Sequence, residues 1–324
     1  MPGEVTEASL TGGVRPTPPQ RSGRVLRHIG LAALLLSCLF FGAALAQHWS
    51  AVEPMIRDQK LLVLLCLLAV PGQAGFVFSA IAFQRLLVGM GERSRLRDAL
   101  GILMVSQFTK YLPGNLAHHV GRVVMSRNTG LAPGPVGIAI LIELAGTALV
   151  AALIAAAFVV IHGSALPDAY GLARLSFNDV VLPALLLGAF VMALALAAWK
   201  WPGHLRALMA PRPVDLAGAL LCYALNFAVL GAIFFTILSQ VAPQAGADYF
   251  FLTAAFATAW TIGVITPGAP GGLGVREAVL LALIAPVHGA EAVLTAALAL
   301  RVVTTLTDVL GFALGLGLRR GASA

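Results

Sequence analysis

The sequence predicts an all-α membrane protein, built as a polytopic bundle of helices. Hydrophobic residues make up 59% of the 324-residue chain, and the mean hydropathy is +0.90. Only 11% of the residues are charged, against about 25% in a soluble globular domain. Several apolar runs are also long enough to cross a bilayer, which takes about 20 helical residues. We therefore expect most of the chain to face lipid or other helices.

Six apolar runs are expected to form complete transmembrane helices. The first run, about 29–46, follows a polar segment, 1–28, that is rich in Pro, Gly and Arg and is expected to be a disordered cytoplasmic tail. Residues 44–47 read Ala-Leu-Ala-Gln, like a signal-peptidase site, but we favour retention of the run as a first span over its cleavage. The other five runs lie at about 61–83, 135–161, 181–199, 216–239 and 291–317.

Two further apolar segments are interrupted by Pro and Gly. The first, about 99–128, is broken at Pro113-Gly114. The second, about 250–286, is broken at 267–272. Lipid cannot satisfy free backbone N–H and C=O groups, so a broken helix at membrane depth must be shielded by protein or must line a polar cavity. Both breaks are therefore expected to lie inside the protein.

The distribution of positive charge predicts the topology. If both interrupted segments are re-entrant helical hairpins, sixteen of the 21 Lys and Arg residues fall on one side of the membrane. A full crossing of the first interrupted segment would remove most of this asymmetry. Because Lys and Arg concentrate in cytoplasmic loops, we predict six full spans, two re-entrant hairpins and both termini in the cytoplasm of a bacterial-type inner (plasma) membrane. The net charge of +7 then reflects orientation and anionic lipid, and no nucleic-acid partner is expected.

This topology contains an inverted repeat. Each half of the chain, about 29–161 and about 181–317, has two spans, one hairpin and one further span. Three crossings per half invert the second half relative to the first. In transporters of this design the substrate site lies between the repeats, at the broken helices. We expect one transmembrane domain over 29–320 with such a site.

The residues beside the two breaks predict a site for an anionic headgroup. A helix beginning near Gly274 would carry Arg276 in its first turn and point its backbone N–H groups toward the break. A helix resuming near Asn115 would carry Arg122 two turns on. Arginine suits phosphate because its donors are planar and bidentate. The expected headgroup-binding residues are Arg122, Arg276, Arg301, Pro113, Gly114, Gly271, Gly272 and Gly274.

Three acidic residues in apolar sequence, Glu143, Glu277 and Asp308, are expected to balance these cations. An unpaired charge costs on the order of 3 kcal/mol at the bilayer centre. Asp308 follows Arg301 by seven residues, so both lie on roughly the same helix face. One alternative is that Arg301 forms a salt bridge with Asp308 or Glu143 that only locks the bundle.

Other interpretations of single residues stay open. Arg276 and Glu277 could pair with each other and only stabilise a helix start. Arg122 could be a cytoplasmic orientation charge. Lys110 could contact a headgroup or only anchor its helix at the interface.

No metal and no cofactor is expected. His118 and His119 are adjacent and diverge by about 100° on a helix, which makes them a poor metal pair. We expect an interfacial role near lipid headgroups instead. The three cysteines lie in apolar runs and are interpreted as small hydrophobic residues.

Two motifs carry a resemblance to a known family. Residues 107–114 read Gln-Phe-Thr-Lys-Tyr-Leu-Pro-Gly with Gly121-Arg122 after them, and residues 270–277 read Pro-Gly-Gly-Leu-Gly-Val-Arg-Glu. They resemble the two signatures of the lysylphosphatidylglycerol synthase transmembrane region, the flippase-like domain family. The resemblance covers about 25–320. In larger members this region precedes a soluble aminoacyl transferase domain and moves the lipid product between leaflets.

The resemblance implies a lipid flippase-like protein. Because the chain contains no aminoacyl transferase domain, we expect a stand-alone member that is not a synthase and not an enzyme. The expected function is translocation of an anionic phospholipid, glycolipid or polyprenyl-phosphate lipid, with membrane lipids as its partners. The alternatives are a membrane-embedded lipid-phosphate enzyme, or a non-transporting partner of a lipid-modifying enzyme. The lipid and the oligomeric state are left open.

Overall fold

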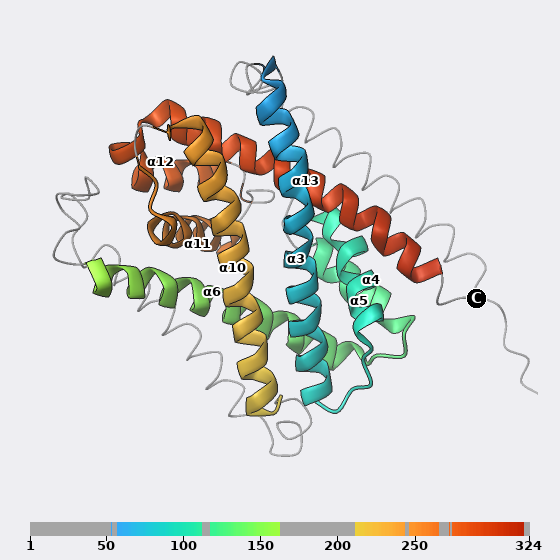
Figure 1. Ribbon diagram of the computed structural model, residues 1–324. Coiled ribbons are helices and arrows are strands. Elements are labelled where there is room, and N and C mark those ends of the chain that lie inside the picture. The colour runs from blue at the N-terminus through green and yellow to red at the C-terminus, as the bar shows by residue number, and fades with distance from the viewer. Residues whose placement is uncertain are drawn as a thin grey trace, which may run out of the picture.

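A computed structural model describes residues 53, 57–111, 117–162, 211–243, 246–265, 272 and 274–320. All regular structure in these residues is helical (Figure 1). The helices are α3 (Gln59–Gly89), α4 (Leu96–Gln107), the short 3-10 helix η1 (Phe108–Tyr111), α5 (Ala117–Arg127), α6 (Pro133–His162), α10 (Pro213–Val241), α11 (Tyr249–Ile265), α12 (Val275–His288) and α13 (Ala290–Arg320).

Four of these helices, α3, α6, α10 and α13, are long and apolar enough to cross a membrane. They coincide with the predicted spans at 61–83, 135–161, 216–239 and 291–317, which confirms four long apolar helices in these places. The spans expected at 29–46 and 181–199 lie outside the described residues, as does the tail 1–28. The count of six spans therefore stays a prediction.

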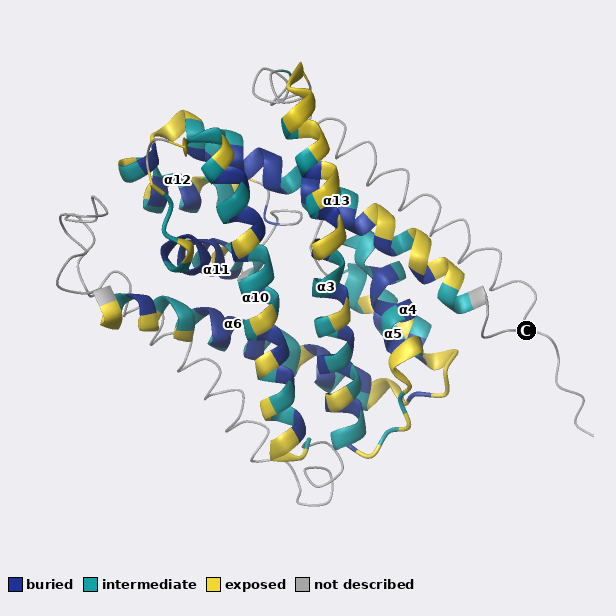
Figure 2. Cartoon of the chain, in the orientation of Figure 1, coloured by how far each residue is buried: buried dark blue, intermediate teal, exposed yellow. Residues whose placement is uncertain are grey.

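Helices α3 and α10 form the centre of the bundle, where they run antiparallel and pack along their lengths (Figure 1). Their large buried side chains include Phe83 of α3 and Phe234 of α10, both fully buried. Their outer faces stay apolar, since Val70 and Leu221 are more than 60% exposed. Figure 2 shows this division between buried inner faces and exposed outer faces. Exposed apolar surface of this extent is typical of a face that contacts lipid.

Close helix packing depends on glycines that leave no room for a side chain. A Cβ at Gly72 of α3 would lie 2.4 Å from Thr307 Oγ1 of α13, and a Cβ at Gly311 would lie 2.6 Å from the Phe76 ring. The backbones of α3 and α13 therefore approach closely, as small residues permit between membrane helices. Thr307 also donates a hydrogen bond to the carbonyl of Ala69 on α3, at 3.4 Å.

Each interrupted segment contains two described helices, one before and one after its expected break. The described helices end at Tyr111 and Ile265 and begin again at Ala117 and Val275, whereas Pro113, Gly114 and most of 267–272 lie outside the described residues. The two helices of each segment pack together, α4 against α5 and α11 against α12. Entry and exit at one membrane face, and the inverted repeat, stay predictions.

Helix α13 connects the two interrupted segments. It passes across the molecule from the end that carries α12 to the end that carries α4 and α5 (Figure 1). Along this path α13 contacts α12, α3, η1 and α4. One continuous helix therefore touches both segments that were expected to build the site.

Candidate functional site

Three ion pairs join the interrupted segments to the long helices. Each pair links one residue of η1, α5 or α12 to one residue of α6 or α13, and each carboxylate is little exposed. The pairs are Arg122–Glu143, Lys110–Asp308 and Glu277–Arg301. Buried ions are tolerated where they are paired and hydrogen-bonded. The expected cations and carboxylates are thus arranged as partners.

Arg122 is the most deeply buried cation of the site. It lies on α5, is 3% exposed, and its Nη1 donates to Glu143 Oε2 of α6 at 2.6 Å. Its guanidinium carbon lies 6.0 Å from the ring centroid of Phe83, within the range of a cation–π contact. The preceding residue, Gly121, lies against α4, where a Cβ would meet Ser106 Cβ at 3.5 Å, an ordinary van der Waals contact. This burial argues against a surface orientation charge.

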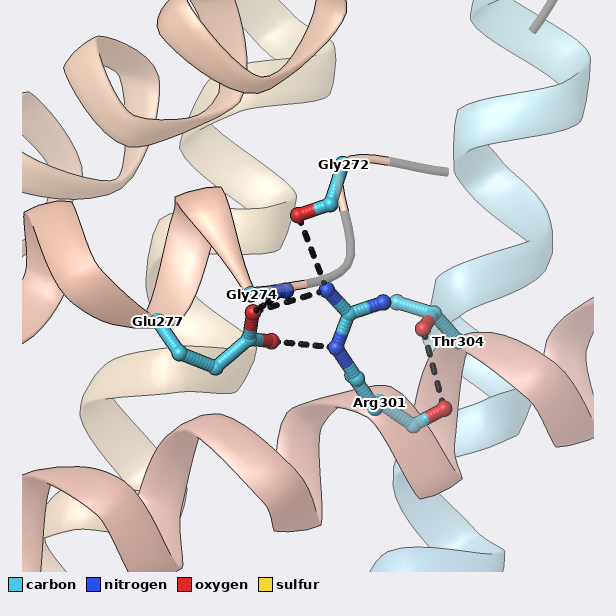
Figure 3. Close-up of polar contacts among 5 residues, drawn as sticks. All are labelled: Gly272, Gly274, Glu277, Arg301 and Thr304. Carbon is cyan, nitrogen blue, oxygen red and sulfur yellow. Dashed lines mark hydrogen bonds and ion pairs between the residues drawn. The ribbon is translucent and has the colours of Figure 1, made fainter. Parts of the chain in front are cut away.

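The start of α12 is tied to α13 through one guanidinium (Figure 3). Arg301 Nη2 donates to Glu277 Oε2 at 2.9 Å and to the carbonyl of Gly272 at 3.1 Å, and its Nε donates to Glu277 Oε1. The backbone N–H of Gly274 donates to Glu277 Oε2 at 2.8 Å. Gly272 and Gly274 have φ of +71° and +80°, which glycine adopts without strain. The glycines of the motif therefore serve a specific turn.

Glu277 is held ionised by this arrangement. Helix α12 is not one of the candidate spans. Burial acts to raise the pKa of Glu277, but the hydrogen bond and charge of Arg301, with the Gly274 N–H, bring it below its ordinary value. Sequence reasoning paired Arg301 with Asp308 or Glu143 as one alternative, and that pairing is wrong. Seven residues along a helix separate two side chains by about 10 Å, whereas Glu277 lies on the neighbouring helix.

Arg276 does not pair with Glu277, contrary to the alternative considered for it. Its guanidinium carbon lies 5.8 Å from the ring centroid of Trp260 on α11. The side chain fills the space beside two glycines, since a Cβ at Gly263 would lie 2.7 Å from its Cγ and a Cβ at Gly272 would lie 2.8 Å from its Nε. Arg276 therefore lies beside the Arg301 cluster, against α11.

Lys110 is the partner of Asp308. Its Nζ lies 2.6 Å from Asp308 Oδ2, and the Asp308 side chain is 5% exposed. Sequence spacing missed this pair because it joins η1 to a helix almost two hundred residues later. The available signal was a lysine at the end of a half-helix that would otherwise point into apolar surroundings. Helix α13 thus binds one interrupted segment through Arg301 and the other through Asp308.

The charged site residues that the structure describes form three clusters. Arg301, Glu277, Gly272 and Gly274 share hydrogen bonds, with Arg276 beside them. Arg122 and Glu143 form the second cluster, and Lys110 and Asp308, between η1 and α13, form the third. Pro113, Gly114 and Gly271 lie outside the described residues.

The histidines lie beside the Arg122 cluster. Their ring centroids are 3.8 Å apart, so the expectation that His118 and His119 diverge is wrong for the rings. Side-chain rotation brings the rings together although their Cβ atoms point apart. Helix α5 is not a candidate span. Burial, and next the charge of Arg122, lowers the pKa of His119 to about 4, so this imidazole is neutral at pH 7.

Sequence reasoning missed Tyr223 of α10. It is 3% exposed and its ring packs on α6, where a Cβ at Gly146 would lie 3.0 Å from Tyr223 Cε2. The phenol interacts electrostatically with Glu143 and Arg122. A tyrosine in the middle of an apolar span was the only signal available. Among the residues that the structure describes, no three His, Cys, Asp or Glu side chains are grouped so that they could hold a metal ion.

Comparison with protein families connects this chain to one family of membrane proteins. The family model described as the lysylphosphatidylglycerol synthase transmembrane region matches residues 26–311. A search of curated proteins found no match. Together with the four apolar helices, the family match identifies a multi-pass membrane protein with a function connected to membrane lipids. The match extends over most of the chain and includes both interrupted segments, so the protein belongs to the family of lysylphosphatidylglycerol synthase transmembrane regions.

Proposed function

We propose that the protein translocates a lipid with an anionic headgroup between the leaflets of a bacterial-type inner membrane. The proposed lipid is a phospholipid, a glycolipid or a polyprenyl-phosphate lipid. The observation that carries the proposal is the buried Arg122–Glu143 pair, which joins an interrupted segment to a long helix. Intramembrane ionisable residues of this kind mark substrate pathways more often than fold stability.

The proposed mechanism is an exchange of partners. Arg122 donates to Glu143 when no headgroup is present. A lipid phosphate presents two acceptor oxygens to the planar guanidinium fork, as a carboxylate does, so it competes with Glu143 for Arg122. Once the phosphate is bound, Glu143 is released and the attachment of α5 to α6 weakens. Binding of the headgroup therefore changes the stability of one arrangement of the helices relative to another.

Helix α13 gives this exchange a route to the second interrupted segment. Arg301 binds the start of α12, and Asp308 binds η1, and both residues lie on α13. A movement of one interrupted segment therefore displaces α13, which contacts the other segment. In the proposed mechanism the two interrupted segments move against the rest of the bundle and expose the site to each leaflet in turn. The protein performs no covalent chemistry in this mechanism and needs no cofactor.

A reconstituted liposome assay tests the proposal. Fluorescent phosphatidylglycerol is placed in both leaflets, and dithionite quenching reports how fast the inner lipid reaches the outside. We expect the wild-type protein to accelerate exchange over protein-free liposomes. If wild-type protein leaves the rate unchanged for phosphatidylglycerol and for glycosylated polyprenyl phosphate, translocation is wrong, and copurification with a lipid-modifying enzyme becomes the leading alternative.

Variants of the pair separate binding from folding. Arg122→Gln alone leaves Glu143 buried and unpaired, so loss of activity could reflect misfolding. The double variant Arg122→Gln/Glu143→Gln removes both charges, so the fold should tolerate it better. We expect the double variant to fold and still fail to move lipid. Arg93→Gln, on an exposed residue, is the matched control and should keep the wild-type rate.

A further inference from the structure

One face of α5 carries a line of polar side chains that points into the protein. His118, Arg122 and Ser126 follow one another at intervals of four residues, so they lie on one face with a rise of about 6 Å between neighbours. We call these three residues the polar line of α5. Arg122 is 3% exposed and Ser126 is fully buried. The opposite face is apolar and open, with Val120 at 61% exposure.

This arrangement is the reverse of a helix on a soluble protein, which buries its apolar face. Lipid accounts for the outward valines. Contact with lipid does not explain why the polar face of α5 points inward. Apolar side chains on that face would pack better against the neighbouring apolar helices. The inward face of α5 therefore needs polar groups to bind inside the protein.

Each member of the polar line has a buried polar atom without a hydrogen-bond partner. The atoms are His118 Nδ1, Arg122 Nε and Ser126 Oγ. Tyr223 Oη of α10 is also buried without a hydrogen-bond partner. Native proteins leave few buried polar atoms unpaired, and each such atom calls for an explanation. Four of them around one ion pair indicate groups whose partner is a ligand that arrives when the helices separate.

Two of these groups, on Arg122 and Tyr223, lie beside Glu143 of α6. Arg122 of α5 pairs with Glu143 of α6 at 2.6 Å. Tyr223 packs on Gly146, one turn after Glu143, and interacts electrostatically with both members of the ion pair. Helix α6 contacts both α5 and α10. Arg122, Glu143 and Tyr223 thus come from three helices that meet at α6, and His118 and Ser126 lie one turn of α5 to either side of Arg122.

We propose that the inner face of α5 is the path of the headgroup, with His118, Ser126 and Tyr223 as additional headgroup-binding residues, and that the headgroup is a phosphate carrying hydroxyl groups. This inference rests on the proposed function and extends it. Arg122 receives the phosphate. Its neighbours along the line receive the hydroxyls, so the headgroup moves from one turn of α5 to the next.

The chemistry of the neighbours selects hydroxyl groups. An imidazole and the hydroxyls of Ser and Tyr can each donate or accept a hydrogen bond, as a glycerol or sugar hydroxyl can. An ammonium headgroup would instead need a carboxylate, and His118, Ser126 and Tyr223 supply none; phosphatidylethanolamine in the test shows whether the Glu143 released by phosphate binding serves as one. The same chemistry is offered by phosphatidylglycerol and by a glycosylated polyprenyl phosphate, so both are probes in the test.

The decisive variants remove single oxygen atoms. Ser126→Ala and Tyr223→Phe each delete an oxygen that has no partner in this structure, so neither change breaks a hydrogen bond within the fold. If these residues serve only the fold, both variants should be as stable and as active as wild type. If they bind the headgroup, transport slows about five- to tenfold, the effect of one lost hydrogen bond in the bound state, while the melting temperature is unchanged.

Matched controls make the same chemical changes elsewhere. Ser94→Ala deletes another buried hydroxyl without a hydrogen-bond partner, outside the bundle centre. Tyr249→Phe deletes a phenolic hydroxyl that donates to the carbonyl of Ala228. Both controls should keep the wild-type transport rate. All variants are measured in the full chain, reconstituted in liposomes with fluorescent phosphatidylglycerol, a fluorescent glycosylated polyprenyl phosphate or fluorescent phosphatidylethanolamine.

The outcomes distinguish this inference from the proposed function. Slowed transport of either hydroxylated lipid in Ser126→Ala and Tyr223→Phe supports the path, and the faster lipid identifies the source. If the double variant of Arg122 and Glu143 stops transport but both oxygen deletions keep the wild-type rate, the path along α5 is wrong and the function stands. If phosphatidylethanolamine moves as fast as the hydroxylated lipids, the assigned headgroup chemistry is wrong. If wild-type protein moves no lipid, both fail.

Discussion

Arg122, Lys110 and Arg301 each keep a charge inside the protein by pairing it with a carboxylate on a neighbouring helix. A buried pair is weak evidence for stability, because the cost of removing two ions from water offsets their attraction. Removing one partner is costly, because the other charge then stays buried alone. This asymmetry gives a way to tell a pair kept for the fold from a pair kept for ligand exchange.

The Lys110–Asp308 pair provides one test at this scale. Lys110→Met should destabilise the protein by about 3 kcal/mol, because it leaves the buried Asp308 carboxylate without its cation. Thermal unfolding in detergent measures the loss. Lys110→Met/Asp308→Asn should recover most of it. Equal melting temperatures for the single variant and wild type would show that the pair contributes nothing to the fold.

At the scale of helices, sequence reasoning located the charged residues but not their partners. Periodicity shows which residues share a face of one helix, as with Arg301 and Asp308. It does not show which helix packs beside that face, and packing decides that Arg301 binds Glu277 and Asp308 binds Lys110. The breaks could be predicted because Pro and Gly act locally. Tyr223 could not, because its role depends on contact with α6.

The attachment of α12 to α13 predicts a local effect. Arg301→Gln removes the donors to Glu277 and to the Gly272 carbonyl, so the first turn of α12 should open more often. Hydrogen–deuterium exchange should rise about tenfold or more at the N–H groups of Gly274 and Ala278, which donate to Glu277 and to the Gly274 carbonyl in this turn. Exchange in η1 is the internal reference and should stay unchanged. A rise spread evenly over all helices would indicate general destabilisation instead.

The close approach of α10 and α11 gives a second test at the scale of helices. Gly231→Ala should destabilise the protein by about 1–3 kcal/mol through overpacking, because its Cβ would lie 2.1 Å from Thr253 Oγ1. Gly137→Ala is the matched control, since a Cβ there meets nothing within 4 Å. Denaturation in detergent should separate the two variants. A neutral result for both would mean that α10 and α11 can move apart at little cost.

At the scale of the whole molecule, the charge distribution predicts one orientation in the membrane. Single cysteines are introduced at Arg93, Arg127 and Arg57 after Cys38, Cys66 and Cys222 are replaced by alanine. A membrane-impermeant thiol reagent should label positions 93 and 127 only in inverted vesicles, and position 57 only in intact cells or right-side-out vesicles. Labelling of 93 and 127 from opposite sides would mean that the first interrupted segment crosses the membrane completely.

The central claim is that Arg122 exchanges its carboxylate partner for a lipid phosphate. Solid-state NMR on liposomes measures this directly, through the dipolar coupling between phosphorus of phosphatidylglycerol and the guanidinium carbon of labelled arginines. We expect a coupling that disappears in Arg122→Gln/Glu143→Gln and persists in Arg93→Gln. A coupling that survives removal of Arg122 and vanishes only with exposed arginines would contradict it.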